Sequence, residues 1–115
     1  MKRMKLSVSG FGRAGKVVRQ NDVYTVMDVS ELKDLVVSMT ILHPGKETSG
    51  HSHDQADEVY FFVDGEGSML IGDKRSGVKN GDIMLIPRGD FHRVFNRSKH
   101  DLKFVCVFEK YGDRC

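Results

Sequence analysis

Two stretches of the sequence decide the fold: 45-GKETSGHSHDQADEVYFFVDG-65 and 81-GDIMLIPRGDFHRVFN-96. Each combines histidine with a short run of β-branched and aromatic residues. In the first stretch, residues 59–63 are apolar strand formers that end at Asp64 and Gly65. The turn pair Asn80–Gly81 leads into the apolar run 83–86 of the second stretch. Both stretches therefore predict short strands that are separated by tight turns.

The same pattern continues on both sides of these stretches. Residues 35–42 form a β-branched run that stops before Pro44, because proline cannot donate to a strand ladder. Further strands are predicted at 68–71, 91–96 and 102–108. The last run alternates, and one of its faces carries Leu102, Phe104, Cys106 and Phe108. Turn signals recur about every 8–12 residues, which predicts an all-β sandwich or barrel. Only residues 30–34 could support a helical turn.

The composition is that of one globular domain. The chain has 115 residues, of which 39% are apolar and 30% are charged, as in ordinary soluble domains. No apolar run approaches the roughly 18 residues of a membrane span, and the N-terminus lacks the apolar core of a secretory signal. The two cysteines, Cys106 and Cys115, are too few for a disulfide framework. We therefore expect a cytoplasmic protein that does not contact the membrane.

Positive charge is concentrated at the N-terminus. The first 20 residues contain no acidic side chain and six basic ones, Lys2, Arg3, Lys5, Arg13, Lys16 and Arg19. We interpret residues 1–16 as a basic, flexible arm and residues 17–115 as the barrel domain. A basic arm could bind nucleic acid. However, this one has no interleaved aromatic residues and belongs to no nucleic-acid-binding module, so we predict no such partner.

A glycine-rich segment in this arm resembles a cofactor motif. Residues 10–15, GFGRAG, fit the spacing of a dinucleotide-binding turn, and Lys16 extends the fit towards a phosphate-binding loop. Both motifs need a preceding strand, a long following helix and a parallel sheet. Here Val17 begins a β-branched stretch and stands where a phosphate-binding loop has serine or threonine. We interpret the segment as a flexible loop and predict no nucleotide cofactor.

The first stretch carries three potential metal ligands, His51, His53 and Glu58. On a strand, His51 and His53 point to the same side with their Cα atoms about 6.5–7 Å apart. The polar turn at residues 54–57 lets the chain reverse and bring Glu58 back to the same point. Two imidazole nitrogens with one carboxylate suit a first-row transition metal better than calcium or magnesium, which prefer oxygen ligands.

The second stretch supplies a fourth candidate ligand, His92. Pro87 and Gly89 form a rigid turn that aims His92 inward. Asn96 lies an even number of residues further along and should face the same side, in a structural role. We therefore predict one divalent transition-metal ion on His51, His53, Glu58 and His92.

These two stretches resemble the two sequence motifs of the cupin family. The match runs from Gly45 to Asn96 as G-x5-H-x-H-x4-E-x6-G and G-x5-P-x-G-x2-H-x3-N, and every specified position is present. The resemblance implies a double-stranded β-helix, or jelly-roll barrel, with the metal inside. It also implies that the ligands are the three histidines and the glutamate named above. Small microbial single-domain cupins are the most similar members, and many cupins form homodimers through their outer sheets.

The predicted ligand set leaves room for a substrate. Four protein ligands leave about two positions open on an ion that prefers six. Iron or manganese is favoured, and zinc, nickel, cobalt and copper also fit the donors. Glu58 and Tyr60 are the catalytic candidates, because strand alternation turns Tyr60 to the same side as Glu58. Tyr60 is either a proton donor near the metal or an aromatic residue packed in the core.

Two classes of function follow from this site. The first is a metal-dependent enzyme acting on a small oxygenated substrate, of the isomerase or epimerase type or of the dioxygenase or decarboxylase type. The second is a non-catalytic, metal-dependent binder or sensor of a small molecule. A phosphorylated sugar is the less favoured substrate, because no basic residue is predicted to face inward. His43 is a further candidate for a position near the barrel mouth.

Overall fold

The computed structural model describes residues 4–52 and 56–110. This part of the chain contains one short helix and nine strands. In chain order they are α1 (Phe11–Ala14), β1 (Lys16–Gln20), β2 (Tyr24–Val29), β3 (Leu35–Leu42), β4 (Glu58–Asp64), β5 (Glu66–Ile71), β6 (Lys74–Lys79), β7 (Ile83–Ile86), β8 (His92–Phe95) and β9 (Leu102–Glu109). No helix within these ranges is long and apolar enough to cross a membrane.

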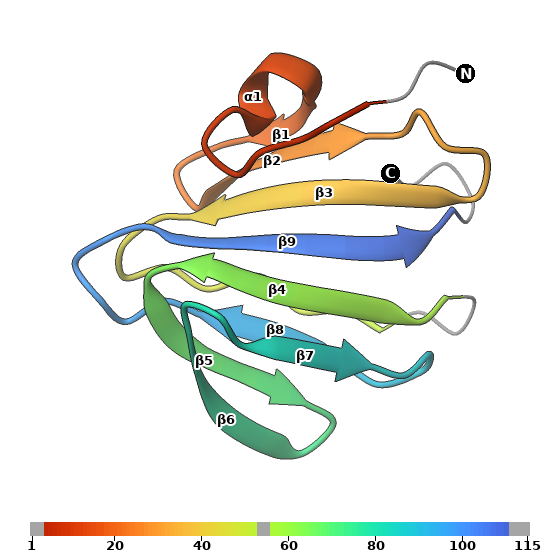
Figure 1. The fold of residues 1–115 in the computed structure, drawn as a ribbon. Helices are drawn as coiled ribbons and strands as arrows, with labels where there is room; N and C mark the ends of the chain where they lie inside the picture. The colour runs from red at the N-terminus through yellow and green to blue at the C-terminus, as the bar shows by residue number, and fades with distance from the viewer. Residues whose placement is uncertain (1–3, 53–55, 111–115) are drawn as a thin grey trace.

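The strands form two antiparallel sheets (Figure 1). The larger sheet has the strand order β1–β2–β3–β9–β4–β7, and the smaller sheet has the order β6–β5–β8. Strand β9 pairs with both β3 and β4, so the last strand of the chain lies in the middle of the larger sheet. Such long connections between antiparallel strands are typical of a jelly roll. The predicted all-β jelly-roll barrel is confirmed.

The predicted strands at 35–42 and 83–86 are observed with the same bounds, whereas the helical turn predicted at 30–34 is wrong. Residues 30–34 are irregular, with a bend at 32–34. All five residues are exposed, so no buried side chain anchors a helical turn there. The Lys110 ammonium group instead donates to the carbonyls of Ser30 and Leu32, at 3.1 and 2.6 Å. These bonds hold the bend against the end of β9.

The main core fills the space between the two sheets. In β9 every second residue is buried, as predicted, because successive side chains point to opposite faces of a sheet. The larger sheet contributes apolar side chains that meet Met69, Val78 and Val94 of the smaller sheet. The other buried members of this core are Val36, Leu42, Tyr60, Phe62, Ile86, Leu102, Phe104, Cys106 and Phe108.

A second apolar cluster covers part of the outer face of the larger sheet. Phe11 of α1 is buried there against Met27, Val29 and Met39. Residues 11–14 thus form a helix with a buried anchor, inside the segment that the sequence assigned to the arm. After α1 the chain enters β1, which is antiparallel to β2. The boundary between arm and barrel stays a prediction.

Candidate metal centre

Three of the four predicted ligands converge at one end of the larger sheet. Glu58 begins β4 and His92 begins β8, and His51 lies on the segment before β4. The Glu58 Oε1 atom lies 3.5 Å from His92 Nε2 and 4.0 Å from His51 Nε2. The two imidazole rings meet edge to face, with their centroids 4.4 Å apart. These three side chains form the one group of metal-ligand type found in the described residues.

Backbone pairing brings His51 to His92. The His51 N–H donates to the His92 carbonyl at 3.1 Å, and the His92 N–H donates to the His51 carbonyl at 2.9 Å. This close approach depends on Gly50, which has a φ of +80°. A Cβ atom at Gly50 would lie 2.5 Å from the Phe91 ring and 3.3 Å from the His92 carbonyl oxygen. The segment therefore needs glycine at this position.

A backbone carbonyl group orients the His92 ring. Its Nδ1 atom lies 3.1 Å from the Asp90 carbonyl oxygen, which accepts a hydrogen bond when the proton is on Nδ1. The Nε2 lone pair then points towards Glu58, as metal ligation requires. Burial lowers the pKa of His92, but the Glu58 carboxylate and the Asp90 carbonyl raise it more. The net result is a raised pKa.

The turn that carries His92 is tied to the start of β4. Gly89 has a φ of +89°, and the Asp90 N–H donates to the Pro87 carbonyl at 3.2 Å, so the predicted rigid turn is confirmed. Arg88 donates to Asp57 Oδ1 through its backbone N–H at 3.0 Å and through Nε at 3.3 Å. These two bonds, the backbone one first, lower the pKa of Asp57. The turn and Glu58 are thus held together through adjacent residues.

The donor set fits a transition-metal ion. At metal–ligand bonds of about 2.1 Å, neighbouring donor atoms lie about 3.0–3.5 Å apart. The observed donor separations need only a small contraction to reach that range. Glu58 and His92 are 5% and 2% exposed, whereas the His51 side chain is 48% exposed. The site is therefore walled on one side and open to solvent at His51.

The fourth predicted ligand, His53, lies outside the described residues. Its role therefore stays a prediction. His51 itself forms an isolated bridge with His92 rather than part of a longer strand. The strand geometry expected for the pair His51 and His53 is thus seen only at His51, where Gly50 and the pairing with β8 set the backbone.

Tyr60 is packed in the core beside the candidate ligands, and its role as a proton donor stays a prediction. It lies on the inner face of β4 beside Glu58, and its ring centroid is 5.8 Å from that of His92, nearly perpendicular to it. The same ring stacks on Phe104 at 5.2 Å. It is thus a packed core aromatic whose position is next to the metal ligands. Cys106 pairs with Tyr60 across the sheet and is buried, as expected of a small apolar side chain.

Two other sequence candidates lie away from this centre. His43 follows β3, and its Nδ1 lies 3.2 Å from Asp101 Oδ1. Leu42 pairs with Leu102 at that end of the larger sheet, whereas Glu58 pairs with Phe108 at the other end. His43 is therefore not at the mouth that holds the ligands. The Asn96 amide bonds the carbonyls of Leu42, His43 and His100, which is the structural role predicted for it.

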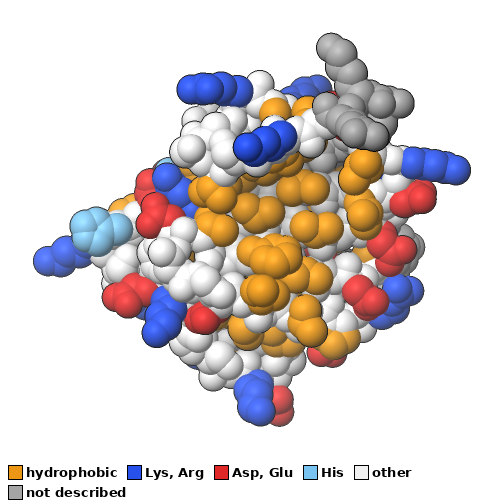
Figure 2. Space-filling view, in the orientation of Figure 1, with side chains coloured by type: hydrophobic (Ala, Val, Ile, Leu, Met, Phe, Trp, Pro, Cys, Tyr) orange, Lys and Arg blue, Asp and Glu red, His pale blue; other side chains and the backbone are white. Residues whose placement is uncertain are grey.

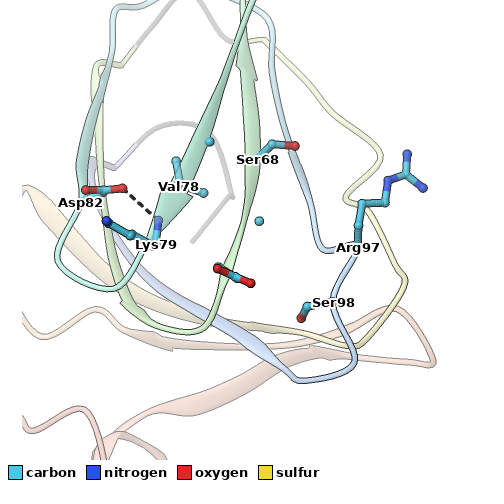
Figure 3. Close-up of a pocket in the computed structure, with 9 residues that line it drawn as sticks. Ser68, Val78, Lys79, Asp82, Arg97 and Ser98 are labelled. Carbon is cyan, nitrogen blue, oxygen red and sulfur yellow. Dashed lines mark hydrogen bonds between the residues drawn. The ribbon is translucent and has the colours of Figure 1, made fainter.

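A surface pocket of about 570 Å³ is also separate from the metal ligands. Figure 3 shows Ser68 on β5 and Lys79 on β6 along one part of its wall, with the loop of Arg97 and Ser98 facing them. Glu66 and Asp82 add negative charge. The lining thus mixes both signs of charge and contains no histidine.

Comparison with known proteins agrees with the barrel fold. The sequence model of the cupin domain matches residues 38–108, a span that includes Glu58 and His92 and most of the barrel. The chain is a member of the cupin family. In the described residues, this cupin has two antiparallel sheets and one cluster of potential metal ligands, His51, Glu58 and His92.

Several cupins and cupin-like barrels are similar to this chain. The glucose-6-phosphate isomerase of Thermococcus litoralis is 31% identical over 111 residues, covering 81% of this chain and 58% of that protein. The oxalate-binding protein of Thermotoga maritima is 32% identical over 66 residues, covering 57% of this chain and 54% of that protein. The chain thus spans just over half the length of both relatives.

A solved structure supports the same fold. An uncharacterised protein with a double-stranded β-helix domain from Klebsiella pneumoniae superposes with a TM-score of 0.79 at 26% identity. The match covers 94% of this chain and 90% of that one. The double-stranded β-helix of this cupin is therefore shared over nearly its whole length.

Proposed function

We propose that this cupin is a metal-dependent enzyme that moves a proton on a small oxygenated substrate, as an isomerase or epimerase does. The observation that supports it best is the buried pair of Glu58 and His92, which converges with the exposed His51 at an open side of the barrel. We place His53 in the same ligand set. Iron or manganese is the favoured ion, since both accept mixed nitrogen and oxygen donors with open positions.

The side chains of the site have distinct roles in this proposal. A bound divalent ion would polarise the substrate's carbonyl and hydroxyl oxygens. Glu58 would supply a carboxylate ligand beside two imidazoles, and the Asp90 carbonyl would accept the His92 proton on Nδ1. Tyr60 is the proton donor or acceptor at the wall of the site, and its stacking on Phe104 fixes its ring.

The similarity to glucose-6-phosphate isomerase favours an isomerase over an oxygen-dependent enzyme. The test uses protein loaded with Mn²⁺ and a panel of aldoses, with and without phosphate, in deuterated water. Proton transfer is expected to place solvent deuterium on the carbon next to the carbonyl. Tyr60→Phe should lower kcat at least tenfold with unchanged Mn²⁺ stoichiometry, and Tyr24→Phe is the matched control. Oxygen uptake without isotope exchange would instead support a dioxygenase and contradict the isomerase.

The oxalate-binding relative favours a second candidate, a metal-dependent binder without catalysis. Titration of the Mn²⁺-loaded protein with oxalate distinguishes it from the enzyme. Tight binding with no isotope exchange on any aldose, and no oxygen uptake, would support the binder.

We also propose that two copies pair through the outer face of the larger sheet. Strands β4, β7 and β9 carry adjacent apolar side chains on that face. We name this set the outer apolar face; it consists of Val59, Phe61, Ile83, Leu85, Val105 and Val107. Figure 2 shows apolar side chains gathered over these strands, with charged groups around them. Ile83 and Leu85 are 57% and 70% exposed. A contiguous apolar patch of this kind marks an interaction surface.

Analytical ultracentrifugation tests the homodimer. The wild-type protein should sediment as a dimer, and Leu85→Glu should sediment as a monomer, because a charge would be buried without a partner. Leu32→Glu is the matched control, since Leu32 is exposed in the bend before β3. A wild-type monomer would overturn this proposal.

We place the protein in the cytoplasm, as its cysteine content suggests.

A further inference from the structure

A row of polar side chains crosses the inner face of the larger sheet beside the metal ligands. Asp28 pairs with Ser38, Ser38 pairs with Cys106, and Cys106 pairs with Tyr60. The four residues thus occupy neighbouring positions on β2, β3, β9 and β4. We name them the polar row. Ser38 lies on the same face of β3 as the core residues Val36 and Leu42, and Tyr60 and Cys106 belong to the core themselves, so the row faces the barrel interior.

Ser38 is the member that a packed core does not explain. Its side chain is 1% exposed, and its hydroxyl has no hydrogen-bond partner among the described residues. Its inward neighbours along β3 are Val36, which belongs to the apolar core, and Thr40. A fully buried hydroxyl normally bonds to protein, to ordered water or to a ligand, so the Ser38 hydroxyl can take a partner that enters from outside the protein. Asp28, also buried, is its neighbour in the row.

The polar row begins at the metal centre. Tyr60 lies two residues beyond Glu58 on β4, and its ring is 5.8 Å from the His92 ring. Neighbouring strands are about 4.8 Å apart. The Cα atom of Ser38 therefore lies about 10 Å from the Cα atom of Tyr60, and that of Asp28 lies about 14 Å from the same Tyr60 atom. The row thus leads from the ligands across three strands of the sheet.

The chemistry of the row indicates what would lie along it. A serine hydroxyl donates and accepts hydrogen bonds, and a carboxylate accepts them. The row contains no lysine, arginine or histidine, so it offers no partner to a phosphate or a second carboxylate. The carboxylate of Asp28 would repel such a group.

We propose that Ser38 and Asp28 determine specificity by binding the hydroxyl groups of a ligand whose other end reaches the metal. The ligand class is then a polyhydroxylated compound with an uncharged tail, rather than a two-carbon acid or a phosphorylated sugar. This inference rests on the proposed metal site and identifies the substrate class of that site.

A pair of matched probes tests the inference. Glycolate and D-gluconate share an α-hydroxycarboxylate that chelates a metal, but only gluconate has a hydroxylated tail. Both are titrated into Mn²⁺-loaded protein, and binding is followed by the water proton relaxation rate, which falls when a ligand displaces water from Mn²⁺. Gluconate should bind at least about tenfold more tightly than glycolate, as expected for two or more extra hydrogen bonds.

Two variants locate the effect in the row. Ser38→Ala and Asp28→Asn should each reduce the preference for gluconate about fivefold, with glycolate and Mn²⁺ affinities changed less than about twofold. Ser30→Ala, at the exposed residue that follows β2, is the control. The wild-type comparison needs no variant, so it stands even if a variant fails to fold.

The possible outcomes separate the two proposals. If both acids displace water equally well, the hydroxyl of Ser38 serves only the fold and this inference is overturned, while the metal site stands. A gluconate preference that survives both variants would also overturn it, because the tail would then bind elsewhere. If the protein takes up no Mn²⁺, the proposed function itself fails.

Discussion

Two histidine–carboxylate pairs lie at opposite ends of the larger sheet, and in the described residues only one of them belongs to a group of three potential metal ligands. His92 and Glu58 are 3.5 Å apart and almost fully buried, and His51 closes the group. His43 and Asp101 are closer, at 3.2 Å, but both are about one-third or more exposed. No third side chain of metal-ligand type joins His43 and Asp101 in the described residues.

The difference shows that convergence and burial, rather than a short distance, define the site. An exposed ion pair is hydrated and contributes little free energy. A buried carboxylate needs compensation by positive charge or hydrogen bonds, which a metal ion with imidazole ligands supplies. The His43 end of the sheet is instead held by the Asn96 amide, whose three hydrogen bonds go to backbone carbonyls. One end thus gathers three potential metal ligands, whereas the other is tied together by side-chain bonds to the backbone.

Removing a histidine at each end should give the largest contrast. His92→Ala is expected to raise the dissociation constant for Mn²⁺ at least about 100-fold, because it removes a buried ligand. His43→Ala should leave that constant unchanged within about twofold. Isothermal titration of both variants measures the contrast. Equal losses in the two variants would mean that the ion does not bind at the His92 end.

Lowering the pH should weaken metal binding at the buried pair. Metal ligation needs neutral imidazole, and the pKa of His92 is raised above its ordinary value of 6.5. The affinity for Mn²⁺ should therefore begin to fall at a pH above that value, by about tenfold per unit for one competing proton. The measurement is Mn²⁺ titration across pH 5 to about 8.5. A profile that is flat above pH 6.5 would contradict the raised pKa.

The metal-free protein should show the opposite pH dependence. A raised pKa in the folded state means that protonated His92 stabilises the fold. This contribution is fully present below the unfolded pKa and is lost as the pH rises through the folded value. Chemical denaturation of metal-free protein should thus show a lower free energy of unfolding at pH 8 than at pH 6, and His92→Gln should remove that difference.

A substitution at the His43 end of the larger sheet should lower the stability of the fold without changing the affinity for Mn²⁺. Asn96→Ala removes the donors to three carbonyls, so the free energy of unfolding should fall by about 1–3 kcal/mol. The affinity for Mn²⁺ should stay within about twofold of wild type. Ser98→Ala is a milder control, since the single Ser98 hydroxyl proton is donated to either the Asn96 Oδ1 atom or the His100 carbonyl. A large loss of Mn²⁺ binding in Asn96→Ala would break the separation between the two ends.

The smallest effect on Mn²⁺ binding is expected at the contact between Arg88 and Asp57. Asp57→Asn weakens the hydrogen bonds from Arg88 that tie the turn before β8 to the start of β4. Both groups are exposed, so stability should change little. Looser positioning of His92 relative to Glu58 should weaken Mn²⁺ binding by no more than about tenfold. Asp64→Asn, at the far end of β4, is the control and should leave binding unchanged.

Much of the larger sheet follows from the sequence, because alternation and turn residues are local properties. Residues 35–42 and 83–86 have the same bounds in the structure, and Cys106 faces the core as its alternation predicts. The helix at 11–14 was missed because its stability comes from burying Phe11 on the sheet, which is a tertiary contact. The turn expected at 30–34 failed for the related reason that Lys110 binds its carbonyls from the other end of the chain.

The candidate site was predicted less completely. His51, Glu58 and His92 follow from motif spacing, since each lies at a defined point relative to a turn. The Asp90 carbonyl that orients His92 has no side-chain signal in the sequence, because the bond uses the backbone. Gly50 and the tie from Arg88 to Asp57 join segments that only the fold brings together. Alternation from Leu42 places Ser38 in the interior. The sequence does not show that Ser38 pairs with Asp28 on one side and Cys106 on the other.

We infer that the buried pair of Glu58 and His92 binds a transition-metal ion together with His51. A crystal structure of the Mn²⁺-loaded protein, with the ion located by anomalous scattering, tests this most directly. We predict one strong peak about 2.0–2.3 Å from the imidazole nitrogens of His51 and His92 and from a Glu58 oxygen, with His53 as the fourth ligand. A peak at His43 and Asp101, or no peak at Glu58 with Mn²⁺ in excess, would contradict the claim.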